Sequence, residues 1–200
     1  MRPVPLVRPV PWWAVLSAGC APVLLIGGWT LAAARQPPGY DPLVATISAL
    51  AARGATDRWV MTVALAGLGV CHAVTALGLR AAAPSGRLTL AVGGVATVLV
   101  AAFPLPEVGT SPQHAVAAGV AFAALSLWPA LALRRGADVP VGLRPAVAVS
   151  ATVLLAGLAA WFTVALNTGT RVGLAERVLA GGQALWPLFV TLSLPKGRRR

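Results

Sequence analysis

The sequence predicts an all-α integral membrane protein, a six-helix transmembrane bundle with a short amphipathic helix in its first outer loop. Hydrophobic residues occupy 58% of the 200 positions and charged residues only 10%, against roughly a quarter charged in ordinary soluble domains. The apolar residues also fall into six long runs separated by short polar stretches. A water-soluble fold has no interior large enough for this much apolar surface, so the runs are expected to face lipid.

Each apolar run, the last of them residues 178–195, lacks Asp, Glu, Lys and Arg and approaches the ~20 residues that a helix needs to cross ~30 Å of hydrocarbon. Spanning β-strands would alternate apolar and polar residues, and these runs do not. We expect spans at about residues 12–34, 59–79, 88–105, 112–133, 145–167 and 175–194. The connections are short, so residues 1–200 are predicted to form a single membrane domain.

The net charge of +11 is better explained by membrane sidedness than by a nucleic-acid partner. Alternating the loops places five basic residues on one side, namely Arg35, Arg53, Arg58, Arg171 and Arg177. The other side receives eleven, which are Arg2, Arg8, Arg80, Arg87, Arg134, Arg135, Arg144, Lys196, Arg198, Arg199 and Arg200. The side with more basic residues is expected to be cytoplasmic. Both termini are therefore expected on the cytoplasmic side of the plasma membrane, where the basic tail 196–200 is expected to contact anionic lipid headgroups. The Ala, Gly, Val and Arg bias is typical of a bacterial source.

The longest connection, residues 35–58, is predicted to be structured. Asp41 can cap a helix that begins at Pro42. Leu43, Ile47 and Leu50 follow on one stripe. These features predict an amphipathic helix from Pro42 to Arg53 that lies over the outer mouth of the bundle.

Four of the five acidic residues fall on the outer side, at Asp41, Asp57, Glu107 and Glu176. His114 lies just inside the fourth span on this same side. It can act as a general base, or it can be an interfacial histidine bonded to a loop carbonyl. Ser48 could complete a hydrolytic triad with His114 and an outer carboxylate such as Glu107, but no nucleophile-elbow motif surrounds it.

Arg177 lies in the first turn of the sixth span, where the helix dipole disfavours a cation. We expect a compensating carboxylate, Asp41 or Glu107, or a bound anion, with His114 nearby. Glu176 and Gln183 form a polar stripe on the same helix.

The remaining polar and sulfur-containing residues indicate structural roles. His72 lies deep in the second span and is expected to be neutral and hydrogen-bonded. Cys20 and Cys71 lie within apolar runs and are predicted to be free packing residues, because no metal-type cysteine spacing exists. Neither a metal nor a cofactor is expected.

Several short motifs in a fixed order resemble a bacterial membrane family, domain of unknown function 998. They are Tyr40-Asp41-Pro42, Ile47-Ser48-Ala49-Leu50, Phe103-Pro104 ahead of His114, and Gly173-Leu174-Ala175-Glu176-Arg177. The resemblance implies six spans with a long first outer loop and highlights Ser48, His114, Glu176 and Arg177. Family members often carry Phe-Pro-x-Asp in the third loop, whereas here Pro106 stands at the Asp position and Glu107 follows.

Two functions from different classes remain open at this stage. The leading hypothesis is a non-enzymatic protein whose outward-facing polar pocket binds a lipid headgroup or a small anionic ligand through Asp41, Ser48, Glu107, His114, Glu176 and Arg177. The alternative is a membrane-embedded hydrolase or transferase acting on a lipid or envelope substrate with His114 as base. A proton-coupled transporter is disfavoured, because no chain of ionisable residues crosses the membrane centre.

Overall fold

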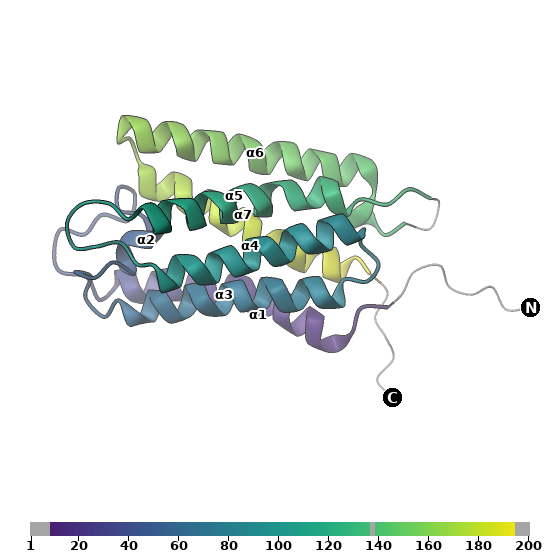
Figure 1. Cartoon of the computed structure of the whole chain (residues 1–200), viewed down its shortest axis with the longest axis horizontal. Helices are drawn as coiled ribbons and strands as arrows, with labels where there is room; N and C mark the ends of the chain where they lie inside the picture. The colour runs from purple at the N-terminus through teal and green to yellow at the C-terminus, as the bar shows by residue number, and fades with distance from the viewer. Residues whose placement is uncertain (1–8, 137–138, 195–200) are drawn as a thin grey trace, which may run out of the picture.

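The computed structural model describes residues 9–136 and 139–194, and within them the chain is helical with no sheet. Six long helices run side by side (Figure 1), namely α1 (Trp12–Ala33), α3 (Trp59–Gly78), α4 (Pro84–Ala102), α5 (Pro112–Ala132), α6 (Pro145–Thr168) and α7 (Val172–Leu192). A short helix, α2 (Ile47–Leu50), and a 3₁₀ turn, Val141–Leu143, lie in connections. Arg2, Arg8, Asp138 and the basic tail predicted to contact lipid lie outside the described residues.

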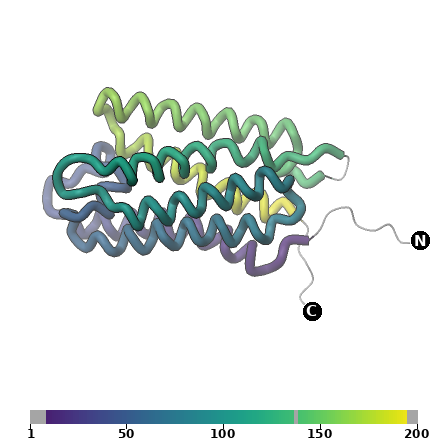
Figure 2. Tube along the Cα trace, viewed as in Figure 1, coloured from purple at the N-terminus to yellow at the C-terminus, as the bar shows by residue number. Residues whose placement is uncertain are grey.

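The long helices form a ring in the order α1, α3, α4, α5, α6 and α7, which closes from α7 back to α1. Packing is closest along α1, α3, α4 and α5, whereas α6 is held more loosely by α5 and α7 and lies at the edge of the bundle (Figure 1). One end, called here the α2 end, carries α2 and residues 34–58, 103–111 and 169–171. The start of α1 and the end of α7 lie at the opposite end (Figure 2).

Five of the six long helices, α1, α3, α4, α5 and α6, are long and apolar enough to cross a membrane. This finding indicates a multi-pass membrane protein. The predicted sixth span forms as the 21-residue helix α7, but it is not among these five. Its polar residues, including Glu176, Arg177 and Gln183, lower its hydropathy, and all three are at least partly buried within the bundle.

Two predicted boundaries differ because of proline. Helix α4 begins at Pro84, four residues earlier than predicted, because proline suits the first helical position. It ends at Ala102 rather than at residue 105, since Phe103 precedes Pro104 and takes a non-helical conformation.

Small residues allow α3 and α4 to approach closely. A side chain at Gly69 would collide with the backbone oxygen of Gly94, and one at Gly94 would collide with the backbone of α3. Such backbone contact is how helices associate in lipid, where burial of apolar area provides little driving force.

The predicted amphipathic helix from Pro42 to Arg53 is mostly wrong. The α-helix covers only Ile47–Leu50, and Thr46 rather than Asp41 provides its cap by accepting a hydrogen bond from the Ala49 N–H. Asp41 instead accepts from the Leu43 N–H at 2.8 Å, which stabilises a separate turn. Ile47 and Leu50 are nonetheless buried, so the loop is packed onto the bundle as expected.

Candidate functional site

The first turn of α7 is joined to the first loop by main-chain hydrogen bonds. The N–H groups of Gly173 and Leu174 donate to the carbonyls of Val44 and Leu43, at 3.2 and 3.0 Å. First-turn N–H groups have no partner within their own helix, and Arg171, which precedes α7, provides no side-chain cap. The loop therefore caps α7 with its own carbonyl oxygens.

Gly173 is required at this joint because the two backbones touch. A Cβ atom at this position would collide with the carbonyl oxygens of Ala45 and Pro42. Only glycine permits an approach this close without displacing one of the segments.

Arg177 binds the same loop through its guanidinium group. Nη1 donates to three carbonyl oxygens, those of Pro42 at 2.6 Å, Ala45 at 2.8 Å and Gly173 at 3.0 Å. Nη2 donates to the Tyr40 hydroxyl at 2.9 Å, and the guanidinium lies 6.0 Å from the Trp29 ring. Backbone dipoles and an aromatic face thus compensate the cation.

The predicted carboxylate partner of Arg177 is therefore wrong. Among the described residues the ion pair is formed elsewhere, between Arg35 and Asp57. Asp41 turns to its own backbone, and Glu107 lies against Gly54. Neither carboxylate reaches the guanidinium.

Glu176 binds the loop from the other side of the same turn. Its carboxylate is 4% exposed and accepts a hydrogen bond from the Ile47 N–H. The Ser48 hydroxyl lies 3.5 Å from its second oxygen. Glu176 and Arg177 together hold N–H groups and carbonyls of residues 40–48, and this arrangement is called here the α7 clamp.

A pocket of about 490 Å³ opens beside the clamp, between α5 and α6. Its polar lining includes Ser48, His114 and Glu176, and its apolar lining includes Phe122, Phe162 and Leu166. The opening falls on the looser side of the ring, where α6 packs on α5. The structure thus brings together three of the residues selected from sequence.

His114 is held by the start of its own helix, α5, and by the end of α4. Its ring Nδ1 lies 2.8 Å from the Phe103 carbonyl, and its N–H donates to the Ser111 hydroxyl, which caps α5. These contacts match the alternative of a histidine bonded to a loop carbonyl. No hydrogen bond joins His114 to Ser48 or Glu176 among the described residues, so a complete triad is not assembled.

A smaller cavity of about 50 Å³ lies behind Glu176, inside the bundle. Ser48, Glu176, Ala118 and Phe122 line both spaces, so the clamp lies at their junction. The cavity is of a size and polarity that accommodates a few water molecules.

This inner cavity is lined by two polar side chains for which the sequence predicts structural roles. His72 is 1% exposed, and neither ring nitrogen has a partner among the described residues. The expected hydrogen bond to His72 is thus not formed with protein. Gln183 donates to the Phe122 carbonyl and the Ser126 hydroxyl, both at 3.0 Å, as predicted for an interhelical contact.

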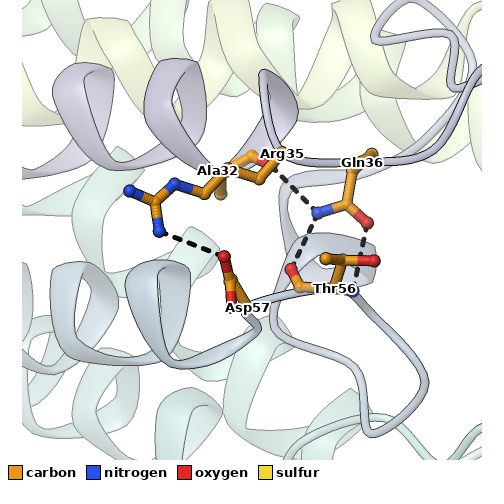
Figure 3. A network of polar contacts seen from close by, with 5 residues as sticks. All are labelled: Ala32, Arg35, Gln36, Thr56 and Asp57. Carbon is orange, nitrogen blue, oxygen red and sulfur yellow. Dashed lines mark hydrogen bonds and ion pairs between the residues drawn. The ribbon is translucent and has the colours of Figure 1, made fainter.

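A second polar network, on the surface of the same end, joins the two ends of the loop (Figure 3). Arg35 pairs with Asp57 at 3.0 Å, and Gln36 binds the backbone of Ala32 and Thr56. These groups face solvent, in contrast to the α7 clamp.

Helical architecture, five apolar helices of membrane-spanning length and a polar site at one bundle end define a multi-pass membrane protein. Residues 19–193 match the model of a family described as protein of unknown function, DUF998, and the chain belongs to this family. No curated protein and no solved structure matches the chain. Three of the four motifs that carried the resemblance, residues 40–42, 47–50 and 173–177, meet in the α7 clamp.

Proposed function

We propose that this protein binds a membrane amphiphile in the pocket between α5 and α6, with the polar head at Glu176 and the apolar part along the two helices. The observation that carries the proposal is a buried carboxylate in the lining of a mainly apolar pocket. Ligand pockets are mainly apolar with a few converging polar groups, and this pocket has that composition.

The charge of the pocket lining indicates which polar head group the ligand carries. Glu176 is the acidic residue of the lining, and the lining contains no Lys or Arg. Arg177 is already bound to four oxygen atoms of the protein. The lining therefore favours a head with hydroxyl or ammonium donors over the anionic head expected from sequence.

Lateral access is supported by the position of α6. This helix is the least buried of the five apolar helices and lies at the edge of the bundle (Figure 1). An amphiphile can enter from the lipid phase between α5 and α6 without passing through the clamped loop.

A volume-filling substitution tests the pocket without altering its polar groups. Gly119 lines the pocket, and a Cβ there meets no atom within 4 Å. Gly119→Leu should lower the lipid retained by the purified protein in native mass spectrometry by about tenfold. Gly157→Leu, on α6 and equally free of contacts, is the matched control. Equal retention in both variants would contradict the proposal.

The hydrolase or transferase alternative is favoured by one observation, that Ser48, His114 and Glu176 line a single pocket. A fluorophosphonate probe that reacts with an activated serine separates the two functions. We expect no labelling, since His114 is bonded to the Phe103 carbonyl rather than to Ser48. Labelling of the native protein that is lost in Ser48→Ala would support the enzyme instead.

We also propose that α7 is a sixth span and that the α2 end faces the cell exterior. The eleven-to-five distribution of basic residues supports this orientation. Val108 is 88% exposed at the α2 end. Val108→Cys, in a chain without Cys20 and Cys71, should react with a membrane-impermeant maleimide in intact cells. Reaction only after lysis would reverse the orientation.

A further inference from the structure

A second groove at the α2 end lies between α3 and α4, on a different side of the ring from the pocket. Its volume is about 690 Å³, and its charged lining residues are Arg53 and Arg58. The remaining lining comes mainly from small and apolar residues of the two helices, including Ala66, Val98 and Ala102. The groove therefore has a cationic end and an apolar length.

Both guanidinium groups of the groove are free of ion pairs among the described residues. The Arg58 guanidinium lies 4.0 Å from the centre of the Trp59 ring, which fixes its plane at the groove edge. Of the nearby acidic residues, Asp57 is bound by Arg35 and Glu107 lies against Gly54. Neither forms an ion pair with Arg53 or Arg58 in the described part of the chain.

The cationic end and the apolar length of the groove match the two parts of a phospholipid, its phosphate and its acyl chains. Arginine forks bind phosphate oxygens in pairs, and a tryptophan such as Trp59, which is 62% exposed, is typical of the membrane interface. Exposed apolar side chains, among them Val63 and Val95, continue along α3 and α4 below the arginines. A phosphate at the cationic end would place acyl chains against this surface.

We propose that the groove between α3 and α4 binds an anionic glycerophospholipid, with its phosphate between Arg53 and Arg58 and an acyl chain along the helices. The site is independent of the α5 and α6 pocket, because the two differ in position and in the charge of their lining. The lipid covers an apolar face at the helix ends nearest the first loop, so it connects the loop to the surrounding bilayer.

The test compares lipid binding by the full chain in nanodiscs of phosphatidylglycerol and phosphatidylcholine. By native mass spectrometry the unaltered chain should retain phosphatidylglycerol preferentially. The double variant Arg53→Gln, Arg58→Gln should lose this preference about tenfold. Arg171→Gln, which removes an exposed cation at the same end outside the groove, should keep it.

A lysine variant and a competition experiment separate a lost binding site from a lost fold, and a lipid site from a phosphate site. Arg53→Lys, Arg58→Lys keeps the charge and should retain part of the preference, which shows that the fold has survived substitution. Equal retention of the two lipids by the unaltered chain, or an unchanged preference in the double glutamine variant, would overturn the proposal. Displacement of the lipid by glycerol phosphate alone at similar concentration would show a phosphate site rather than a lipid site.

Discussion

The first loop is held by two polar networks, one that joins its two ends and one that joins it to α7, and they use similar residues in different surroundings. The Arg35 and Asp57 side chains are 47% and 55% exposed and make one ion pair at 3.0 Å. Glu176 is 4% exposed, and Arg177 beside it donates three hydrogen bonds to the loop, to Pro42, Ala45 and Tyr40. Only the second network contains a buried carboxylate and joins several loop groups at once, and within it the Arg177 bond to Pro42 is exposed.

The comparison shows that burial and the number of partners, rather than the presence of opposite charges, decide how strongly a loop is held. An exposed pair is screened by water and salt and typically stabilises by about 0–1 kcal/mol. Hydrogen bonds from a charged donor contribute about 1.5–3 kcal/mol each, and less where water reaches the acceptor, as at the Pro42 carbonyl. The α7 clamp should therefore dominate the docking of residues 40–48.

Arg177→Ala should have the largest effect on the loop. Removal of the guanidinium leaves the Pro42 and Ala45 carbonyls without their donor, which should cost about 2–4 kcal/mol of loop docking. Chymotrypsin cleavage after Tyr40 or Leu43 reports the open population. Cleavage of Arg177→Ala should accelerate strongly. Arg177→Lys should keep only part of the resistance of the unaltered chain to cleavage.

Gly173→Ala should follow in size, because an added methyl group collides with loop carbonyls. Overpacking of this kind costs about 1–3 kcal/mol. The same cleavage assay applies, with Gly157→Ala as the control at an uncrowded helical glycine. Equal cleavage of the two variants would mean that the loop shifts without cost.

Glu176→Gln should be weaker, at about 1–2 kcal/mol, because an amide oxygen still accepts from the Ile47 N–H. Glu107→Gln makes the same chemical change at an exposed position and should leave cleavage unaltered. If both variants behave alike, the Glu176 carboxylate does not hold the loop.

Asp57→Asn should have the smallest effect, below about 1 kcal/mol. Asparagine tolerates the left-handed backbone of this position, φ 48°, so the change removes charge alone. Thermal unfolding of the variant and the unaltered chain should differ slightly at low salt and converge at high salt. A difference that persists at high salt would indicate that the ion pair is protected from solvent.

The long helices could be predicted from the sequence because uncharged apolar runs mark them. The first turn of α7 could be identified as a site because a cation at a helix N-terminus needs compensation. The partners of Arg177 could not be predicted, since a backbone carbonyl has no signature in the sequence. Tyr40 was present in a recognised motif, yet its contact with Arg177 spans 137 positions. The meeting of His72 and Gln183 in one cavity likewise depends on how α3 and α7 pack.

The predicted helix from Pro42 to Arg53 failed for a physical reason. An apolar stripe with helical spacing fits a continuous helix, but the carbonyls of Pro42, Leu43, Val44 and Ala45 are used by α7 and Arg177 instead of by helical N–H groups. Tertiary hydrogen bonds thus replaced local ones, which left only Ile47–Leu50 helical.

Amide hydrogen exchange across residues 40–50 tests most directly whether the α7 clamp holds the loop over the bundle. If the clamp holds the loop, exchange is slow in the unaltered chain, fast in Arg177→Ala, and unchanged in Asp57→Asn. Exchange in the unaltered chain as fast as in an unstructured peptide, or equal acceleration in the two variants, would contradict this role of the clamp.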